Sequence, residues 1–269
     1  MRTTVRKCGQ ALVIGLFAFV LLANCALAKD KVEEQFHQSY ALNPDGQVRL
    51  DNVNGKIHIT AWDRQEIQVD AVKRADNQQD LAATKIEIDA KAERIKIHTK
   101  HPNSRKNNST TVDYEVKVPT GAHLAAVETV NGSVEIAGVR GPVNASSVNG
   151  LLAAKGLASD TKLETVNGKV EAVFDRLDGV KSISMDAVNG RLELTLPADA
   201  NAEVKAESLN GRIEADKLTV KKNWPVGSEL HGKLGQGGTR VKAETVNGGI
   251  RVKLAGPEGK AQVEQPAKG

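Results

Sequence analysis

Three acidic and three basic side chains recur in step along the second half of the chain. They are Glu171, Glu193 and Glu214, each two places after one of Lys169, Arg191 and Arg212. Enzymes that act on polysaccharides place acids and bases on an outer face in this way, so this set is the first candidate for chemistry. A catalytic pair needs two environments that differ, because the pKa values of its two groups must be set apart. These rows are uniform, which favours a solvated face. A non-enzyme is expected, with a polysaccharide-modifying enzyme as the alternative.

The other residues that often carry chemistry show no recognised spacing. The six histidines are His37, His58, His98, His101, His123 and His231. They form no H-E-x-x-H motif, and the sequence lacks a paired-cysteine motif, a Gly-x-Ser-x-Gly motif and a phosphate loop. The sequence therefore predicts no catalytic residue, no metal ligand and no cofactor.

A repeated Val-Asn-Gly triplet dominates the rest of the chain. Its asparagines are Asn54, Asn131, Asn149, Asn167, Asn189 and Asn247, with a near copy at Asn210 and a degenerate copy at Leu230-His231-Gly232. From Asn131 onward the copies follow one another at intervals of 16 to 22 residues. A fixed period of this kind is typical of stacked repeats that bury their apolar faces against one another.

The residues around each triplet alternate as strands do. The second and fourth positions after the glycine are mostly apolar, as at Leu192 and Leu194, and charged residues lie between them. The arm before the triplet has an apolar residue four places before the asparagine and a small or hydroxyl residue two places before it, as at Leu163 and Thr165. Each repeat therefore predicts two strands around a narrow interior. The low aromatic content of 3% agrees with such an interior.

Two folds can join these strands. Asn-Gly favours a tight antiparallel hairpin, which would build a β-meander or sandwich. Such hairpins would set Glu164 opposite Glu171 and Asp186 opposite Glu193, and like charges directly opposite are destabilising. A parallel solenoid instead stacks the asparagines into a ladder of side-chain hydrogen bonds. We therefore predict an all-β solenoid with an irregular N-terminal β cap, and keep the antiparallel fold as the alternative. The expected ladder is Asn54, Asn131, Asn149, Asn167, Asn189, Asn210 and Asn247.

Residues 1–28 read as a secretory signal peptide. A basic start precedes an apolar run from Ala11 to Ala23, and cleavage is expected after Ala28. A lipid-modified Cys25 is the alternative. Removing the three basic residues of this segment leaves 37 − 3 = 34 basic against 33 acidic residues, so no electrostatic reason for nucleic-acid binding remains. Cys8 and Cys25 would leave with the segment, and the mature chain would carry no disulfide.

The mature chain divides into three expected parts. They are an N-terminal β region or cap at 29–118, the repeat solenoid at 119–256 and a disordered tail at 257–269. The repeat is interrupted at Lys221 to Gly227, where Trp224 precedes a proline. An aromatic residue on an inserted loop of a rigid scaffold is a candidate contact for a sugar or a protein.

Several of these motifs together resemble a known family. Asn-Gly-Lys-Ile-His-Ile from Asn54 precedes Ala61-Trp62-Asp63, a Val-Lys-Val-Pro strand end stops at Pro119, and serial Thr-Val-Asn-Gly turns follow. This order resembles the bacterial putative-adhesin family of β-strand-repeat proteins, a domain of unknown function, over residues 36–255. The resemblance implies a single-stranded right-handed parallel β-helix that is exported across the cytoplasmic membrane and has no catalytic residues.

The expected function follows from the export segment, the repeat and this resemblance. It is an exported non-enzymatic platform, adhesin-like, located in the periplasm, at the outer membrane or outside the cell. Its expected partner is an unknown protein or glycan of the cell envelope, and no transmembrane span is expected in the mature chain. A periplasmic scaffold or an envelope-stress sensor component is the further alternative.

Overall fold

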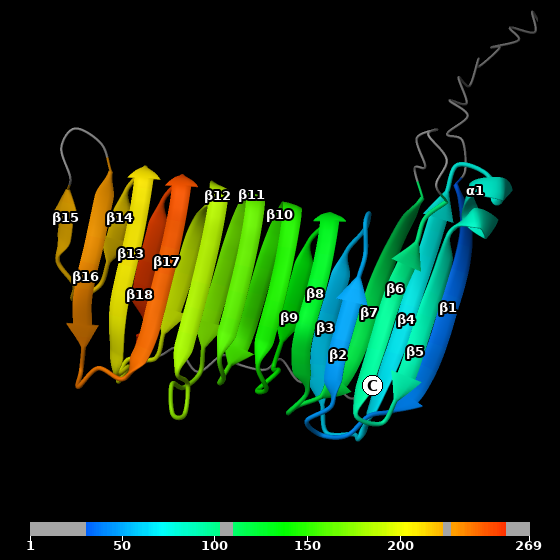
Figure 1. Cartoon of the computed structure of the whole chain (residues 1–269), viewed down its shortest axis with the longest axis horizontal. Coiled ribbons are helices and arrows are strands. Elements are labelled where there is room, and N and C mark those ends of the chain that lie inside the picture. The colour runs from blue at the N-terminus through cyan, green and yellow to red at the C-terminus, as the bar shows by residue number, and fades with distance from the viewer. Residues whose placement is uncertain (1–30, 103–109, 223–226, 257–269) are drawn as a thin grey trace, which may run out of the picture. The chain divides into compact units, whose positions relative to one another are not determined.

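The computed structural model describes residues 31–102, 110–222 and 227–256, and these form an all-β unit with one short helix (Figure 1). The helix α1 spans Gln78–Ala83. The strands are β1 (Val32–Ala41), β2 (Gln47–Asp51), β3 (Ile57–Trp62), β4 (Glu66–Ala75), β5 (Lys85–Lys91), β6 (Arg94–Lys100), β7 (Thr111–Pro119), β8 (His123–Asn131), β9 (Val134–Ala137), β10 (Val143–Leu157), β11 (Thr161–Phe174), β12 (Ser182–Leu196), β13 (Ala202–Asn210), β14 (Ile213–Ala215), β15 (Val220–Lys222), β16 (Ser228–Leu234), β17 (Thr239–Asn247) and β18 (Ile250–Leu254). The expected signal peptide with Cys25 and Ala28, the candidate contact Trp224 and the expected tail at 257–269 lie outside the described residues.

Each full repeat forms one coil, with a first arm before its Asn-Gly pair and a second arm after it. The first arms are β2, β8, the first halves of β10, β11 and β12, and then β17 and β13; each pairs in parallel with the next. The second arms are β3, β9, the second halves of β10, β11 and β12, and then β18 and β14, and they also pair in parallel. The expected parallel pairing is therefore present, and the tight hairpins of the alternative fold are not formed at these repeats.

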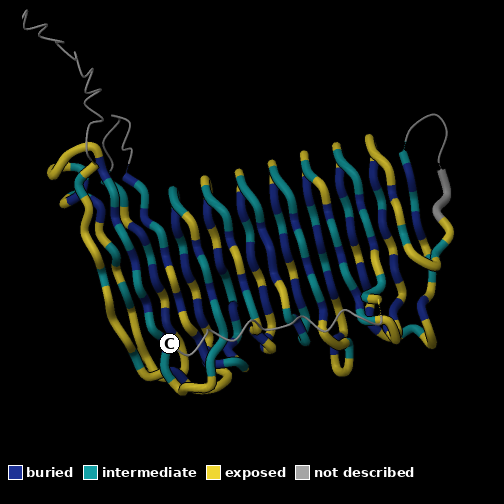
Figure 2. Tube along the Cα trace, turned by 180° about the vertical axis from the view of Figure 1, so that it is seen from behind, coloured by how far each residue is buried: buried dark blue, intermediate teal, exposed yellow. Residues whose placement is uncertain are grey.

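Alternate side chains of both arms fill one apolar core. In β11, Leu163, Val170 and Ala172 are fully buried, and the buried positions repeat from coil to coil (Figure 2). The hydroxyl residue two places before the asparagine is buried as well. The Ser147 and Ser208 hydroxyls donate to a glycine carbonyl of the neighbouring coil, at 3.3 and 2.9 Å. Thr245 makes the same kind of bond, to Gly190 at 3.2 Å, whereas the buried hydroxyls of Thr129 and Thr165 have no hydrogen-bond partner among the described residues. The bond is therefore formed at some repeats and not at others.

The coils do not stack in the order of the chain. Strand β17 pairs with both β12 and β13, and β18 pairs with both β12 and β14. The last coil therefore lies between the two coils that precede it in the sequence, as the orange β17 shows in Figure 1. Stacking in chain order, as the repeat pattern suggested, is wrong here. Every coil offers the same register, so the pattern does not encode which coil is the neighbour.

Antiparallel strands lie at both ends of the stack. At one end β16 pairs with β13 and β15 pairs with β16; at the other, β4 pairs with β1 and β7, and β5 with β6. The degenerate copy at Leu230-His231-Gly232 lies in β16, where His231 faces Lys205. The prediction that Leu230-His231-Gly232 is a degenerate copy of the Val-Asn-Gly turn, with His231 in the place of the asparagine, is therefore wrong. Histidine lacks the amide that donates and accepts in such a ladder, and an antiparallel end strand needs none.

Candidate functional site

The asparagine side chains form one hydrogen-bonded row along the stack. Each Nδ2 donates to the Oδ1 of the neighbouring asparagine at 2.8 to 3.0 Å, in the spatial order Asn54, Asn131, Asn149, Asn167, Asn189, Asn247, Asn210. The glycine that follows each asparagine lets the coils approach. A Cβ on Gly168 would lie 1.9 Å from the carbonyl oxygen of Gly150. We call this row the asparagine ladder; it joins the Asn-Gly turns of all seven coils.

From Asn131 onward, the residue before each asparagine of the ladder points to solvent although it is apolar. Its exposed fraction ranges from 37% at Val148 to 55% at Leu209. We call this set the valine stripe; it comprises Val130, Val148, Val166, Val188, Val246 and Leu209. Single exposed apolar side chains are ordinary, whereas a line of them is a candidate interaction surface.

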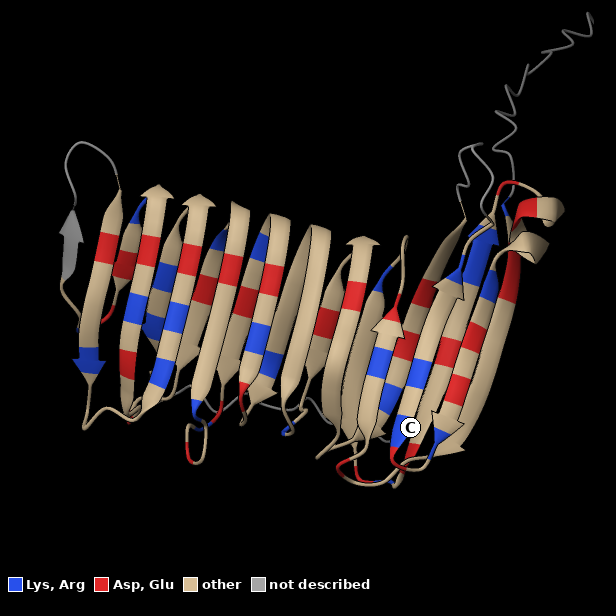
Figure 3. Cartoon of the chain, in the orientation of Figure 1, with Lys and Arg blue, Asp and Glu red and all other residues tan. Residues whose placement is uncertain are grey.

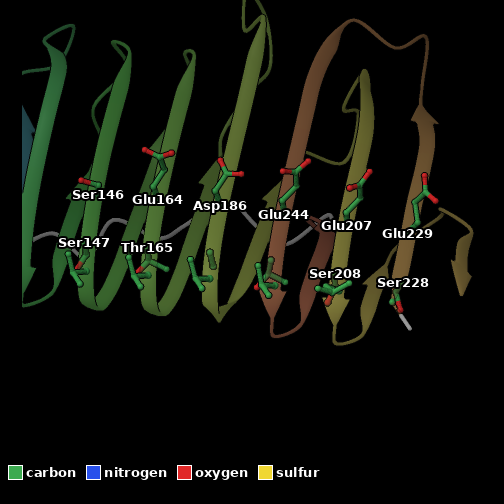
Figure 4. Close-up of a pocket in the computed structure, with 18 residues that line it drawn as sticks. Ser146, Ser147, Glu164, Thr165, Asp186, Glu207, Ser208, Ser228, Glu229 and Glu244 are labelled. Carbon is green, nitrogen blue, oxygen red and sulfur yellow. The ribbon is translucent and has the colours of Figure 1, made fainter. Parts of the chain in front are cut away.

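A row of carboxylates runs parallel to the valine stripe. In the repeats, the acid stands three places before the asparagine, and parallel pairing sets these acids side by side on one face (Figure 3). We call this set the acidic row; it comprises Glu164, Asp186, Glu244, Glu207 and, from the antiparallel end strand, Glu229. Figure 4 shows these side chains pointing to the same side of the strands, with Ser146 continuing the row on β10.

The acidic row and the valine stripe, apart from Val130, form the two walls of a groove of about 810 Å³. Its floor is the line of nearly buried small residues between them, which includes Ser147, Thr165 and Ser208. Five of the described residues that line the groove are acids, and none is a lysine or an arginine. The groove thus offers a negative wall and an apolar wall that face each other.

Lysines pair with the acidic row from the side away from the groove. The Nζ atoms of Lys162, Lys242 and Lys205 lie 3.0, 2.8 and 2.7 Å from the acid two places later on the same strand. Hydrogen bonds to these acids raise the pKa values of Lys205 and Lys242. Asp186 instead accepts a hydrogen bond from Ser184 at 3.0 Å. These pairs are solvent-exposed, where an ion pair contributes little.

The acids and bases singled out in the sequence lie on the second arms and do not form one row of three. Glu171 stacks beside Glu193, but Arg251 of the last coil lies between Glu193 and Glu214. The expected continuous acidic row is therefore wrong. Lys169 hydrogen-bonds Glu171 and lies 3.0 Å from Glu193. Arg191 and Arg212 lie near the acids of their own coils, Glu193 and Glu214, at 3.9 and 4.0 Å.

The electrostatics of this second cluster do not suit a general acid. The hydrogen bond from Lys169 holds the pKa of Glu193 below its usual value, and that from Arg251 does the same for Glu214. A catalytic acid needs a carboxyl that keeps its proton near neutral pH, so its pKa must be raised. Both carboxyls shift in the opposite direction. The arrangement is that of ion pairs between coils.

His37, His58 and His98 each lie near an acid, on the three different strands β1, β3 and β6. His58 is 3.2 Å from Glu115, and His37 is paired with Asp70. Within residues 31–102, 110–222 and 227–256, no three His, Cys, Asp or Glu side chains gather as metal ligands. The described residues also contain no helix with the length and apolar character needed to cross a bilayer.

The groove was not predicted from the sequence. The signal was present there, since an apolar residue precedes every asparagine of the repeat. In a strand this position lies two residues after the outward-facing acid, so it too faces outward. The exposed stripe was not predicted because the valine was considered only as the first residue of the Val-Asn-Gly triplet.

Several solved structures are similar to this chain at low identity. A putative cell adhesion protein from Clostridium sporogenes is 12% identical, with 82% of this chain and 100% of that chain covered and a TM-score of 0.46. A putative adhesin from Bacteroides fragilis is 12% identical, with 82% and 97% covered and a TM-score of 0.37. A putative lipid binding protein from Parabacteroides distasonis is 11% identical, with 81% and 96% covered and a TM-score of 0.31.

No match was found among the curated proteins. The family comparison gave a match over most of the chain, at residues 38–253, to the family described as Toastrack DUF4097. This match confirms the resemblance that the repeated turns indicated, and its span is close to that of residues 36–255. The chain therefore belongs to the Toastrack DUF4097 family, whose function is unknown.

Proposed function

We propose that this protein is an exported, non-enzymatic binding platform of the bacterial cell envelope, with an adhesin-like role. The observation that carries the proposal is the groove, in which an exposed apolar stripe and a row of carboxylates face each other across the four neighbouring strands β11, β12, β17 and β13. An apolar line of this length is costly to leave in water unless it meets a partner.

The fold suits a platform because its surface is rigid and regular. Each inner coil is paired on both sides, and the asparagine ladder adds a side-chain bond at every step. Wall residues therefore repeat at about the 4.8 Å spacing of neighbouring strands. We include in the proposal a single-stranded, right-handed winding of the coils, with residues 29–118 supplying the N-terminal cap.

A non-enzymatic role is supported by the second cluster. The pKa values of Glu193 and Glu214 are both lowered, so the two carboxyls are not set apart as an acid and a base. An assay for released reducing ends or unsaturated sugars on envelope polysaccharides should therefore stay silent. A signal that disappears in the Glu193→Gln variant would contradict this part of the proposal.

Localisation of the processed protein tests the export and surface parts. We expect the mature chain to begin at Lys29, as read by N-terminal sequencing, and external protease to cleave it on intact cells. Protein that protease reaches only after the outer membrane is opened would end the adhesin role and leave the periplasmic scaffold or sensor. An uncleaved protein in the cytoplasm would end the proposal as a whole.

An array of envelope proteins and glycans identifies the partner. The mature chain should bind at least one member, and binding should fall when the groove is altered. Variants of Glu171 and Glu193 on the opposite arms report whether a different face is used.

A further inference from the structure

We infer that the groove takes an extended peptide segment in which basic and apolar side chains alternate. This inference rests on the proposed binding function and specifies the chemistry of the partner. It assigns the acidic row to the basic side chains and the valine stripe to the apolar ones.

The two unlike walls match the geometry of an extended chain. In a strand, successive side chains point to opposite sides, so a segment that lies along the stack sends alternate residues to alternate walls. The groove crosses five neighbouring strands that carry acids, from β11 to β16. Four spacings of about 4.8 Å give a length of roughly 19 Å, which about six extended residues span.

The acidic row predicts that the partner segment carries positive charge. The described lining holds five carboxylates without a basic side chain, so an acidic segment or a nucleic acid would be repelled. The lysines that pair with Glu164, Glu244 and Glu207 approach from outside the groove. A carboxylate offers about four acceptor positions, so these acids can accept from a ligand ammonium as well.

Recognition must come from side chains. The backbone groups of the floor are already paired between coils, as the continuous registers through Thr165, Ala187 and Thr245 show. A bound segment therefore adds no strand to the sheet. Binding should instead depend on charge, which makes it sensitive to salt, and on the order of the side chains, which the two walls impose.

The opposite arms provide a matched control. There the acids are interleaved with bases, since Lys169 lies between Glu171 and Glu193 and Arg251 follows. Neutralising Glu171 and Glu193 removes the same kind of charge from the same coils without touching the groove.

The test uses the mature chain, residues 29–269, and a fluorescent six-residue probe of alternating lysine and valine in an anisotropy titration. The alternating probe should bind at least about tenfold more tightly than a Lys₃Val₃ block of the same composition, because the block cannot satisfy both walls. An alternating Glu-Val probe should not bind. Raising the salt from about 0.05 to 0.5 M should weaken the alternating probe by about tenfold or more, since exposed charges are then screened.

Three variants locate the site on the chain. Glu164→Gln combined with Asp186→Asn should weaken the probe about tenfold, and Val166→Ser combined with Val188→Ser should weaken it several-fold. Glu171→Gln combined with Glu193→Gln should change it less than about twofold. All six positions are at least partly solvent-accessible, and circular dichroism with urea unfolding verifies that each variant remains folded.

Each contrary result has a defined meaning. Equal binding of the block and alternating probes, or equal weakening by the control pair, would overturn the inference. If an envelope partner on the array binds the groove variants as well as the unaltered chain, the platform stands and the groove inference falls. If the probe behaves as expected but no envelope partner is found, the groove inference stands and the proposed envelope function falls.

Discussion

At the residue scale, each inner asparagine both donates to one coil and accepts from the next. Asn167 donates to Asn149 at 3.0 Å and accepts from Asn189 at 2.9 Å. Asn167→Ala removes both bonds and leaves two neighbouring amides with one partner fewer. We expect the free energy of unfolding to fall by about 1–2 kcal/mol, measured by urea denaturation.

A double-mutant cycle separates the ladder from local effects. Asn149→Ala and Asn167→Ala share one bond, so their combined cost should be smaller than the sum by about 0.5 kcal/mol or more. Asn54→Ala and Asn210→Ala lie at opposite ends of the ladder and should add within about 0.5 kcal/mol. Additivity in both pairs would show that the asparagine side chains do not stabilise one another.

Tyr114 is a second residue whose contribution to the free energy of unfolding can be measured separately. Burial raises the pKa of its hydroxyl to about 12, although the hydrogen bond with Thr99 opposes the shift. In the unfolded chain this pKa is near 10. As the pH rises between these values the unfolded state loses a proton that the folded state keeps. The tyrosine contribution is therefore intact below about pH 10 and falls by roughly 1.4 kcal/mol per unit above it.

The Tyr114→Phe variant tests this contribution. It should be less stable than the unaltered protein at pH 8, because Thr99 loses its partner, yet it should lose less stability between about pH 10 and 11.5. Urea midpoints across this range give the comparison, and the lysines titrate equally in both proteins. Identical losses in the two proteins would mean that the Tyr114 hydroxyl ionises freely in the folded state.

At the element scale, the closeness of the coils depends on glycine. A Cβ on Gly190 would lie 2.0 Å from the carbonyl oxygen of Gly168 in the neighbouring coil. This oxygen belongs to the backbone, so relief requires the two coils to separate and the ladder between Asn167 and Asn189 to stretch. Gly190→Ala should therefore lower the free energy of unfolding by about 2 kcal/mol or more.

The matched control is Gly256→Ala, where an added Cβ meets no atom within 4 Å. It should change stability by less than about 0.5 kcal/mol. Urea denaturation of both variants gives the comparison. If Gly190→Ala were as mild as the control, close approach of the coils would not be what fixes glycine in the repeat.

The elements themselves were largely predictable from local patterns. Alternation at Leu192 and Leu194 marked a strand, and both are buried in β12. The same alternation is present in β6, where Ile95 and Ile97 are buried and the strand pairs with β5. These successes share a cause, since period-two burial depends only on residues near in sequence. The prediction that the arms pair in parallel was less secure, because it relied on the like charges that antiparallel hairpins would place opposite each other.

At the scale of the whole molecule, the sequence could not reveal which coil touches which. The position of β17 between β12 and β13 sets Arg251 beside Glu193 and adds Glu244 and Val246 to the groove. Neighbouring repeats in the chain are the natural assumption, because each offers the same Asn-Gly register. The candidate site was missed for a related reason, since its walls only become continuous when distant coils are stacked.

Because every coil offers the same register, β12 and β13 should be able to pair directly with each other when the last coil is removed. Ser184 of β12 and Lys205 of β13 both pair with Lys242 of β17, on its two sides. In the intact protein Ser184 and Lys205 are therefore two strand spacings apart, about 9.6 Å, which is too far for a disulfide. If the chain ends at Gly238, β12 and β13 can pair directly, and the spacing falls to about 4.8 Å. We expect a Ser184→Cys and Lys205→Cys pair to cross-link in the shortened chain alone.

Mass spectrometry after mild oxidation of residues 29–269 and 29–238 gives the measurement, and both native cysteines are absent from these chains. Single-cysteine variants control for links between molecules, and oxidation in urea controls for links in the unfolded state. Free thiols in a folded shortened chain would show that the gap stays open or that the local coils unfold, and a disulfide in the intact chain would contradict the interposed coil. The shortened chain also lacks Glu244 of the acidic row, so it should bind the alternating peptide more weakly than the intact protein.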